Sequence, residues 1–207
     1  WRSVGHSYNA FFTESFMDEL AVKAGQDPYK YRRDLLAAHP DYLAVLDRVA
    51  SEADWDLPMH SGRGRGIALH ESFGSLVAQV AEVSVLPDDT IQLDRVICVV
   101  DCGRVINPDT VVAQIEGAIV FGLSAALYGD ITLTDGAVDQ GNFPDYEMVR
   151  LNNMPKIEVH LAPSGRPIGG IGEVGTPPLA PALANAIFNA TGKRVRELPL
   201  SKAGLVG

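Results

Sequence analysis

The first quarter of the chain carries large apolar residues at helical spacing. Between about residues 8 and 24 they recur every fourth position, at Phe12, Phe16 and Leu20. This spacing predicts a helix that buries those side chains and ends at Gly25. The acidic residues of the same segment are then expected on the side that faces water: Glu14, Asp18 and Glu19.

Two further helices complete a helical N-terminal segment, residues 1–60. Asp27 suits an N-cap, and Pro28 suits the first position of the second helix. Pro40 interrupts the pattern before a third helix. The apolar positions that mark these two helices are Tyr31, Leu35, Leu43, Leu46 and Val49.

The pattern changes to extended segments after residue 60. Ile67–Ser72 is predicted as a strand, and Val77–Val85 with Ile91–Val100 as a hairpin around a Pro-Asp-Asp turn. Few charges interrupt these strands, which indicates burial on both faces. The glycines of Gly62–Gly66 precede a strand instead of linking a strand to a helix, so they do not match a Rossmann dinucleotide-binding turn.

The remaining half of the chain mixes helices with short strands. A helix capped by Asn107 or Asp109 carries an apolar stripe at Val112, Ile115 and Ile119. Downstream, the pattern predicts a hairpin-rich segment at 131–150 and a strand at 156–161. It then predicts a helix at 178–190, stopped by the glycine at 192, and a short strand at 195–198. We therefore expect an α+β fold, in which residues 61–207 form a mixed or antiparallel sheet packed with helices after the N-terminal helical segment.

Charge narrows the classes of partner. Seventeen Lys and Arg oppose 26 Asp and Glu, for a formal charge of −9. This balance argues against a nucleic-acid or anionic-lipid surface and favours a small molecule or a protein as partner. No apolar run was expected to reach the roughly 20 residues of a membrane span.

The two cysteines are not placed for cross-linking or metal binding. In an extended run Cys98 and Cys102 would lie roughly 13 Å apart on one face, too far for a disulfide. No Cys/His cluster has the spacing of a zinc site, and the five scattered histidines are interpreted as structural.

One carboxylate stands in an unusual setting. Glu173 lies in "PIGGIGEVGTPPLAPALANAIFNA", between glycines at 169, 170 and 172 and a Pro-Pro pair. Glycines allow the loop to approach another group closely, while Thr176 is predicted to cap the next helix and Pro177 to begin it.

Two roles for Glu173 remain open from these residues. It can complement the dipole or cap an amide of the following helix. Alternatively it can act as a general base, because glycine, proline and aliphatic neighbours would disfavour its charged form by desolvation. No second carboxylate lies nearby in sequence for a glycosidase-type pair, and no GxSxG elbow is present.

Three segments together resemble a known family. They are "WRSVGHSYNAFFTESFMDELAVKAGQDPYKYRRDLL", "DCGRVINPDTVVAQIEGAIVFGLSAAL" and "GIGEVGTPPLAPALANAIFNATGKRVRELPL". In this order they resemble the C-terminal part of the molybdenum-binding subunit of the xanthine dehydrogenase/aldehyde oxidase family, most closely the isoquinoline 1-oxidoreductase β-subunit branch.

The resemblance implies roles for particular residues. The glutamate of the family's Gly-x-Gly-Glu motif falls on Glu173, next to Gly172, and is the catalytic base that takes a proton from the attacking oxygen. The aromatic-Arg-x-x-Gly element places Arg2 near the molybdenum, and the Gln-x-Glu-Gly helix start makes Gln114 a cofactor contact. The Gly74-Ser75 turn is a further candidate for binding cofactor phosphate.

The resemblance also implies a cofactor and partners. The cofactor is molybdopterin with molybdenum, in the cytosine dinucleotide form, whose dithiolene sulfurs hold the metal. Electrons leave through a separate [2Fe–2S] subunit, because two cysteines cannot supply the four ligands of such a cluster. The upstream part of the same subunit is expected as the other partner, so that the 207 residues alone are a fragment, inactive and without cofactor.

The expected activity is hydroxylation of N-heteroaromatics or oxidation of aldehydes. Two alternatives stand beside it. One is a non-catalytic domain that keeps the fold for assembly or ligand binding. The other is an unrelated α+β enzyme that uses Glu173 as a lone base without molybdenum.

Overall fold

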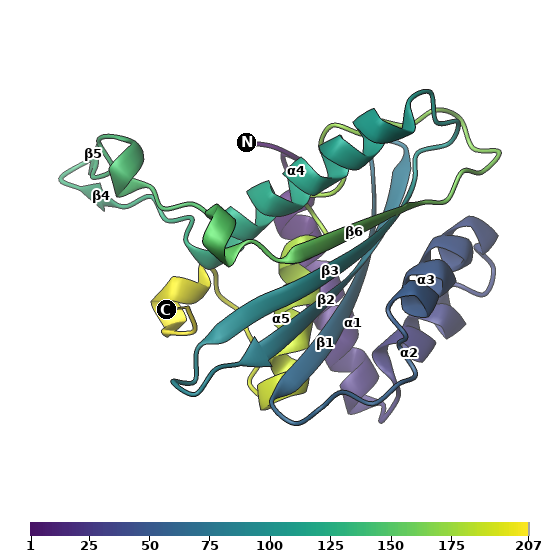
Figure 1. The fold of residues 1–207 in the computed structure, drawn as a ribbon, viewed down its shortest axis with the longest axis horizontal. Coiled ribbons are helices and arrows are strands. Elements are labelled where there is room, and N and C mark those ends of the chain that lie inside the picture. Colours follow the sequence, from purple (N-terminus) through teal and green to yellow (C-terminus); the bar gives the residue numbers. More distant parts are fainter. Residues whose placement is uncertain (207) are drawn as a thin grey trace.

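The computed structural model describes residues 1–206 and contains one four-stranded mixed sheet (Figure 1). Strands β1 (Arg63–Ser72), β2 (Ser75–Val85) and β3 (Ile91–Asp101) follow one another in antiparallel order. Helix α4 (Pro108–Leu127) then returns the chain so that β6 (Lys156–Leu161) pairs in parallel with β3. The α+β prediction with a mixed sheet is confirmed.

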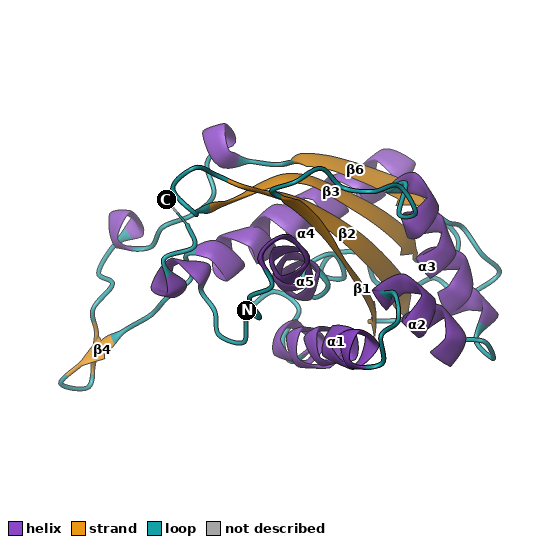
Figure 2. Ribbon diagram, turned by 90° about the horizontal axis from the view of Figure 1, so that it is seen from below, coloured by secondary structure: helices purple, strands orange, loops and turns teal. Residues whose placement is uncertain are grey.

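Helices cover both faces of this sheet. Figure 2 shows α5 (Leu179–Thr191) and α4 under the concave face, with α1 (His6–Lys23) outside α5. Helix α3 (Pro40–Glu52) packs on the opposite face, and α2 (Pro28–Leu35) contacts both α1 and α3. The division at residue 60 stays a prediction, since nothing here tests it independently.

The core has two parts because the central strands are buried on both sides. On the α4/α5 face, side chains such as Val77, Val96 and Cys98 pack against the two helices. On the other face, Ile67 and Ile97 pack against α3. Both cysteines are buried free thiols, as their spacing predicted.

Two glycines at the start of β1 allow close helix packing. A Cβ added at Gly66 would lie 2.2 Å from the Ala186 nitrogen, and one at Gly64 would lie 2.5 Å from the Ala186 carbonyl oxygen. The backbone of α5 therefore rests directly on β1. This contact accounts for two of the glycines in the Gly62–Gly66 run. The sequence pattern had already indicated that this run is not a dinucleotide-binding turn.

Helix α1 buries the face that was predicted to meet water, so the predicted orientation is wrong. Glu14 and Asp18 are buried, whereas Phe12 and Phe16 are 61% and 60% exposed. Arg32 Nε donates to Glu14 Oε2 at 2.9 Å, and Arg194 Nη1 donates to Asp18 Oδ2 at 2.6 Å. Burial raises the pKa of Asp18, against the lowering effect of its hydrogen bond with Arg194. Distant arginines thus make the acidic side the inner side.

Two smaller predictions also differ from the structure. Residues 131–150 contain only two-residue strands, β4 (Leu133–Thr134) and β5 (Ala137–Val138), and a 3-10 turn at Phe143–Asp145. The predicted strand at 195–198 is absent, and this segment leads into a 3-10 turn at Leu200–Ala203. Val195 is the one β-branched residue of this segment, and no strand among the described residues pairs with the segment.

Helix α4 is longer and more apolar than the sequence reading allowed. By length and composition alone it could cross a membrane, which corrects the expectation that no such run exists. Half of its apolar window is buried inside the fold, and Ile115, Ile119 and Leu123 belong to the core. This packing fits a core helix.

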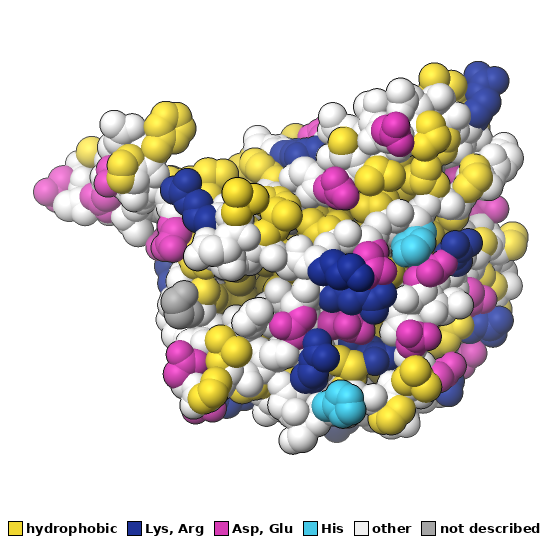
Figure 3. All heavy atoms as spheres, viewed as in Figure 1, with side chains coloured by type: hydrophobic (Ala, Val, Ile, Leu, Met, Phe, Trp, Pro, Cys, Tyr) yellow, Lys and Arg dark blue, Asp and Glu magenta, His cyan; other side chains and the backbone are white. Residues whose placement is uncertain are grey.

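The uncovered part of the sheet face beside α3 carries paired charges. Arg95 Nε donates to Glu158 Oε1 and Arg95 Nη2 donates to Glu158 Oε2, both at 2.8 Å. Lys156 Nζ lies 2.8 Å from Oε1 of the same carboxylate. Figure 3 shows basic and acidic side chains mixed in the middle of this face. The charges neutralise one another locally and form no single-sign patch there.

Candidate cofactor-facing site

Glu173 is held by a residue from the opposite end of the chain. Its Oε1 accepts a hydrogen bond from the backbone N–H of Ser3 at 2.8 Å. Its own carbonyl oxygen accepts from the Thr176 N–H at 3.2 Å, so a tight turn leads from Glu173 towards α5. Within residues 1–206, no hydrogen bond engages Oε2. The half-buried carboxylate therefore has one fixed oxygen and one free oxygen.

The predicted cap of α5 is wrong. The helix begins at Leu179 after Pro178, without a side-chain cap. The Thr176 hydroxyl instead donates to the Ala118 carbonyl oxygen of α4 at 3.2 Å. Since the Glu173 carboxylate accepts from Ser3 and from no amide of α5, the simple helix-cap role for it loses its geometric basis.

Arg2, Gln114 and Gly172 meet beside Glu173. Arg2 Nε donates to the Gly172 carbonyl oxygen at 2.8 Å, and Nη2 donates to Gln114 Oε1 at 3.1 Å and to its carbonyl oxygen at 3.2 Å. The guanidinium also lies 5.9 Å from the centre of the Phe121 ring. Three segments that are far apart in sequence thus meet at one place, which their separate motifs could not show.

Gly74 and Ser75 brace the same glycine loop from the other side. The buried Ser75 hydroxyl donates to the Gly170 carbonyl oxygen at 2.6 Å. A Cβ at Gly169 would lie 2.3 Å from the Ser75 oxygen, so only glycine fits against this turn. The Gly170 N–H in turn donates to the Phe73 carbonyl oxygen at 2.7 Å. Phosphate binding by Ser75 stays a prediction, and in the structure its hydroxyl supports the loop.

The exposed surface next to Glu173 carries donors and small residues. Gln114 and Gly117 are exposed on the first half of α4, and a Cβ at Gly117 would lie 3.8 Å from Arg2 Nη1. In the described part of the chain, Arg2 Nη1 and Gln114 Nε2 make no hydrogen bond. This donor set suits the oxygen-rich pterin and phosphate groups of a molybdopterin. Among the described residues, no three His, Cys, Asp or Glu side chains gather as metal ligands.

A histidine pair lies between α1 and β1 near the same turn. His6 Nδ1 and His70 Nε2 are 3.0 Å apart, and Phe73 stacks edge-on against His6. Burial, followed by the charge of His6, lowers the pKa of His70. The pair ties the start of α1 to the sheet, and sequence reasoning had treated both histidines as merely structural.

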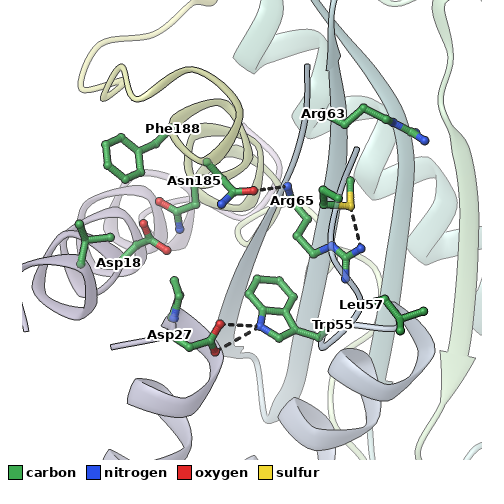
Figure 4. Close-up of a pocket in the computed structure, with 12 residues that line it drawn as sticks. Asp18, Asp27, Trp55, Leu57, Arg63, Arg65, Asn185 and Phe188 are labelled. Atoms are coloured by element: carbon green, nitrogen blue, oxygen red, sulfur yellow. Dashed lines mark hydrogen bonds between the residues drawn. The ribbon is translucent and has the colours of Figure 1, made fainter. Parts of the chain in front are cut away.

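A separate cavity of about 440 Å³, which Glu173 does not line, lies between the end of α1, β1 and α5 (Figure 4). Its polar groups are partly paired with one another. Trp55 Nε1 donates to both oxygens of Asp27, and Arg65 donates to the Asp54 carbonyl oxygen at 2.6 Å. Asp18 is bound by Arg194. Pairing accounts for only part of the polar lining, because Arg63 Nε, Arg65 Nε and Asn185 Oδ1 are buried without a hydrogen-bond partner among the described residues.

The structure brings most of the predicted site residues together, and it adds a backbone donor that sequence reasoning missed. Glu173, Arg2, Gln114 and Gly172 come together as neighbours, and Gly74 with Ser75 packs on their loop. Ser3 was not a candidate because a backbone N–H leaves no residue-type signal. Its position directly after Arg2 in "WRSVG" was the only available indication.

Comparison with protein families identifies the chain as containing a molybdopterin cofactor-binding domain. A family model with this description matches residues 36–155, more than half of the chain. The chain therefore belongs to this family. The resemblance carried by the three sequence motifs is confirmed at family level.

Similarity to individual proteins agrees with this membership. The chain is 34% identical over 206 residues to isoquinoline 1-oxidoreductase subunit beta of Brevundimonas diminuta, covering 98% of the chain and 26% of that protein. It is 30% identical to a protein of Gluconacetobacter polyoxogenes named membrane-bound aldehyde dehydrogenase [pyrroloquinoline-quinone], covering 99% and 29%. The chain thus spans under a third of the length of these curated relatives.

The fold itself matches a solved structure over almost the whole chain. Aldehyde oxidoreductase from Desulfovibrio gigas superposes with a TM-score of 0.74 at 15% identity, covering 96% of this chain and 40% of that one. At this identity the match concerns the fold alone.

Proposed function

We propose that this chain is part of the molybdenum-binding subunit of a molybdenum hydroxylase, with Glu173 as general base. The observation that carries the proposal is the Glu173 carboxylate, fixed through one oxygen and free at the other, beside the donors of Arg2 and Gln114. When bound, molybdopterin supplies the two-electron acceptor and the site of oxygen transfer from water. Substrates are N-heteroaromatics or aldehydes, the classes named in the relatives.

The residues of the chain have separate tasks in this proposal. Glu173 Oε2 accepts the proton of the attacking oxygen, which requires an approach of about 3 Å. Arg2 and Gln114 bind the pterin or its nucleotide, in the cytosine dinucleotide form, through guanidinium and carboxamide groups. The Gly169–Gly172 loop, which accepts a hydrogen bond from the Ser75 hydroxyl, fixes the position of the Glu173 carboxylate.

The outer face of α1 supports the proposed need for the rest of the subunit. Tyr8, Phe12 and Phe16 are each more than half exposed and lie on one side of the helix. A cleft of about 420 Å³ beside them is lined by Trp1 and small residues of α4. Contiguous exposed apolar surface of this kind marks a protein interface. We assign it to the remaining part of the subunit, and the electron exit to a separate [2Fe–2S] subunit.

Cofactor content tests this proposal. The full-length subunit is co-expressed with an iron–sulfur partner and analysed for molybdenum, cytosine nucleotide and pyrroloquinoline quinone, the group in one relative's name. Near-stoichiometric molybdenum and cytosine nucleotide are expected, with dye reduction by an N-heteroaromatic or an aldehyde. Folded protein with neither molybdenum nor turnover would favour the assembly-domain alternative, and turnover without molybdenum would favour the lone-base enzyme.

The role of the donor set is tested by substitution. Gln114→Ala and Arg2→Met are expected to reduce bound molybdenum severalfold, because each removes donors from the cofactor-facing surface. Arg104→Met is the matched control, since Arg104 is exposed and makes no ion pair among the described residues. Equal molybdenum content in all three variants would contradict the assignment.

A further inference from the structure

We propose that the turn formed by residues 1–6 positions the base, with the Ser3 amide as the group that orients Glu173. The inference rests on the proposed function of Glu173. Ser3 is completely buried, so the donor of its 2.8 Å hydrogen bond to Oε1 is removed from water, while the Glu173 carboxylate is half-buried. A hydrogen bond from N–H to a carboxylate is among the stronger ones in proteins, and burial preserves it.

The backbone of this turn is held in an unfavourable conformation. Ser3 has φ 72° and Val4 has φ 39°, both in the left-handed region. Residues other than glycine are uncommon there, and a β-branched residue such as Val4 is a true outlier. Such conformations persist only where the surroundings enforce them, and they gather at functional sites. Here the conformation is what aims the Ser3 N–H at Glu173.

Several contacts enforce the turn. The Val4 N–H donates to the Trp1 carbonyl oxygen at 3.1 Å, and the His6 N–H donates to that of Ser3 at 3.0 Å. The Ser3 and Ser7 hydroxyls bond to each other. Arg2 anchors the turn to Gly172, one residue before the base. The same short segment therefore fixes both the loop that carries Glu173 and the carboxylate itself.

The chemical consequence is a base with one defined proton-accepting oxygen. With Oε1 occupied by the Ser3 amide, Oε2 is the atom left to accept the proton. Ser3 is thus a positioning residue, which orients Glu173 through its amide.

An amide-to-ester replacement removes only this donor. Incorporating the α-hydroxy acid analogue of serine at position 3 of the full-length subunit exchanges the N–H for an oxygen. The same exchange at Gly5 is the matched control, because the Gly5 N–H makes no hydrogen bond in the described part of the chain.

The proposal predicts a fall in kcat with little change in KM. In the Ser3 ester, kcat should fall about tenfold with KM changed less than about threefold, since a hydrogen bond to a charged group contributes on the order of the free energy of a tenfold rate change or more. The Glu173 carboxyl signal in carbon-13 spectra of cofactor-free protein, identified by its loss in Glu173→Gln, should move at fixed pH in the Ser3 ester and keep its position in the Gly5 ester.

Two different results separate the possible failures. If Glu173→Gln abolishes turnover while the Ser3 ester shows the same kcat and the same carboxyl chemical shift as the Gly5 ester, the positioning role is overturned and the base remains. If Glu173→Gln retains turnover, the proposed function itself fails. Should the Ser3 ester lower stability, the carboxyl chemical shift in the folded fraction still decides, because an unchanged chemical shift contradicts the proposal.

Discussion

Replacing Arg32 by methionine should destabilise the protein strongly, because Arg32 compensates a buried acidic helix face. Its side chain is 3% exposed and that of Glu14 is 11% exposed. Arg32 donates to Glu14 Oε2 at 2.9 Å, to the Glu14 carbonyl oxygen at 2.8 Å and to the Pro28 carbonyl oxygen at 3.0 Å. In Arg32→Met, the Glu14 carboxylate keeps only the N–H of Leu69, at 2.8 Å.

The expected loss follows from the cost of an uncompensated buried charge. Removing one partner of a buried ion pair costs about 3–5 kcal/mol. This is a large part of the roughly 5–15 kcal/mol by which a protein is stable. At a urea m-value of about 2–3 kcal/mol/M, the unfolding midpoint should fall by about 1–2 M in a circular-dichroism titration.

Arg33→Met is the matched control for this prediction. Arg33 is the neighbouring residue on α2, and its ion pair with Asp47 is exposed, with side chains 50% and 38% accessible. Exposed pairs contribute about 0–1 kcal/mol, so the control midpoint should move by less than about 0.5 M. Equal midpoints for the two variants would refute the view that buried carboxylate–arginine pairs set the orientation of α1.

Two further predictions concern packing and pH. Gly66→Ala should lower the free energy of unfolding by about 3 kcal/mol in a urea titration, because the added Cβ would meet the backbone of α5. Gly165→Ala, with open space around the residue, should be nearly neutral. Similar losses in the two variants would contradict the close packing of α5 on β1. Hydrogen bonds from Arg95 and then Lys156 lower the pKa of Glu158 from 4.5 to about 2. The unfolded chain therefore binds the proton first, and stability present above pH 4.5 is lost as the pH falls towards 2. An Arg95→Met variant should show a shallower loss in acid titrations, and an unchanged slope would contradict this assignment.

The elements of the sheet could be predicted from sequence because their signals are local. The β2–β3 hairpin and the start of β6 follow from β-branched runs and turn residues. The orientation of α1 could not, because Glu14 and Asp18 become inner residues only through Arg32 and Arg194, which come from other parts of the chain. Periodicity alone predicts that charged side chains face water. Here the arginines that bind the two carboxylates make the charged side of α1 the buried side.

The candidate site shows the same limit. The motifs around Arg2, Gln114 and Glu173 were recognisable one by one, but their meeting depends on how α4 and the glycine loop pack. The sequence indicated that the glycine at 169 allows a close approach, but the group that it approaches, Ser75, is known only from the tertiary structure. The Ser3 donor was invisible, because every residue other than proline offers the same amide.

Turnover of the Glu173→Gln variant tests the central claim most directly. The cofactor-loaded full-length subunit with its iron–sulfur partner is assayed by dye reduction, with Glu147→Gln as control because Glu147 is an exposed loop carboxylate. We predict that Glu173→Gln keeps its molybdenum while kcat falls about 10²–10⁴-fold, the usual contribution of a general base, and that the control matches wild type. A Glu173→Gln subunit with full molybdenum and wild-type kcat would contradict the account.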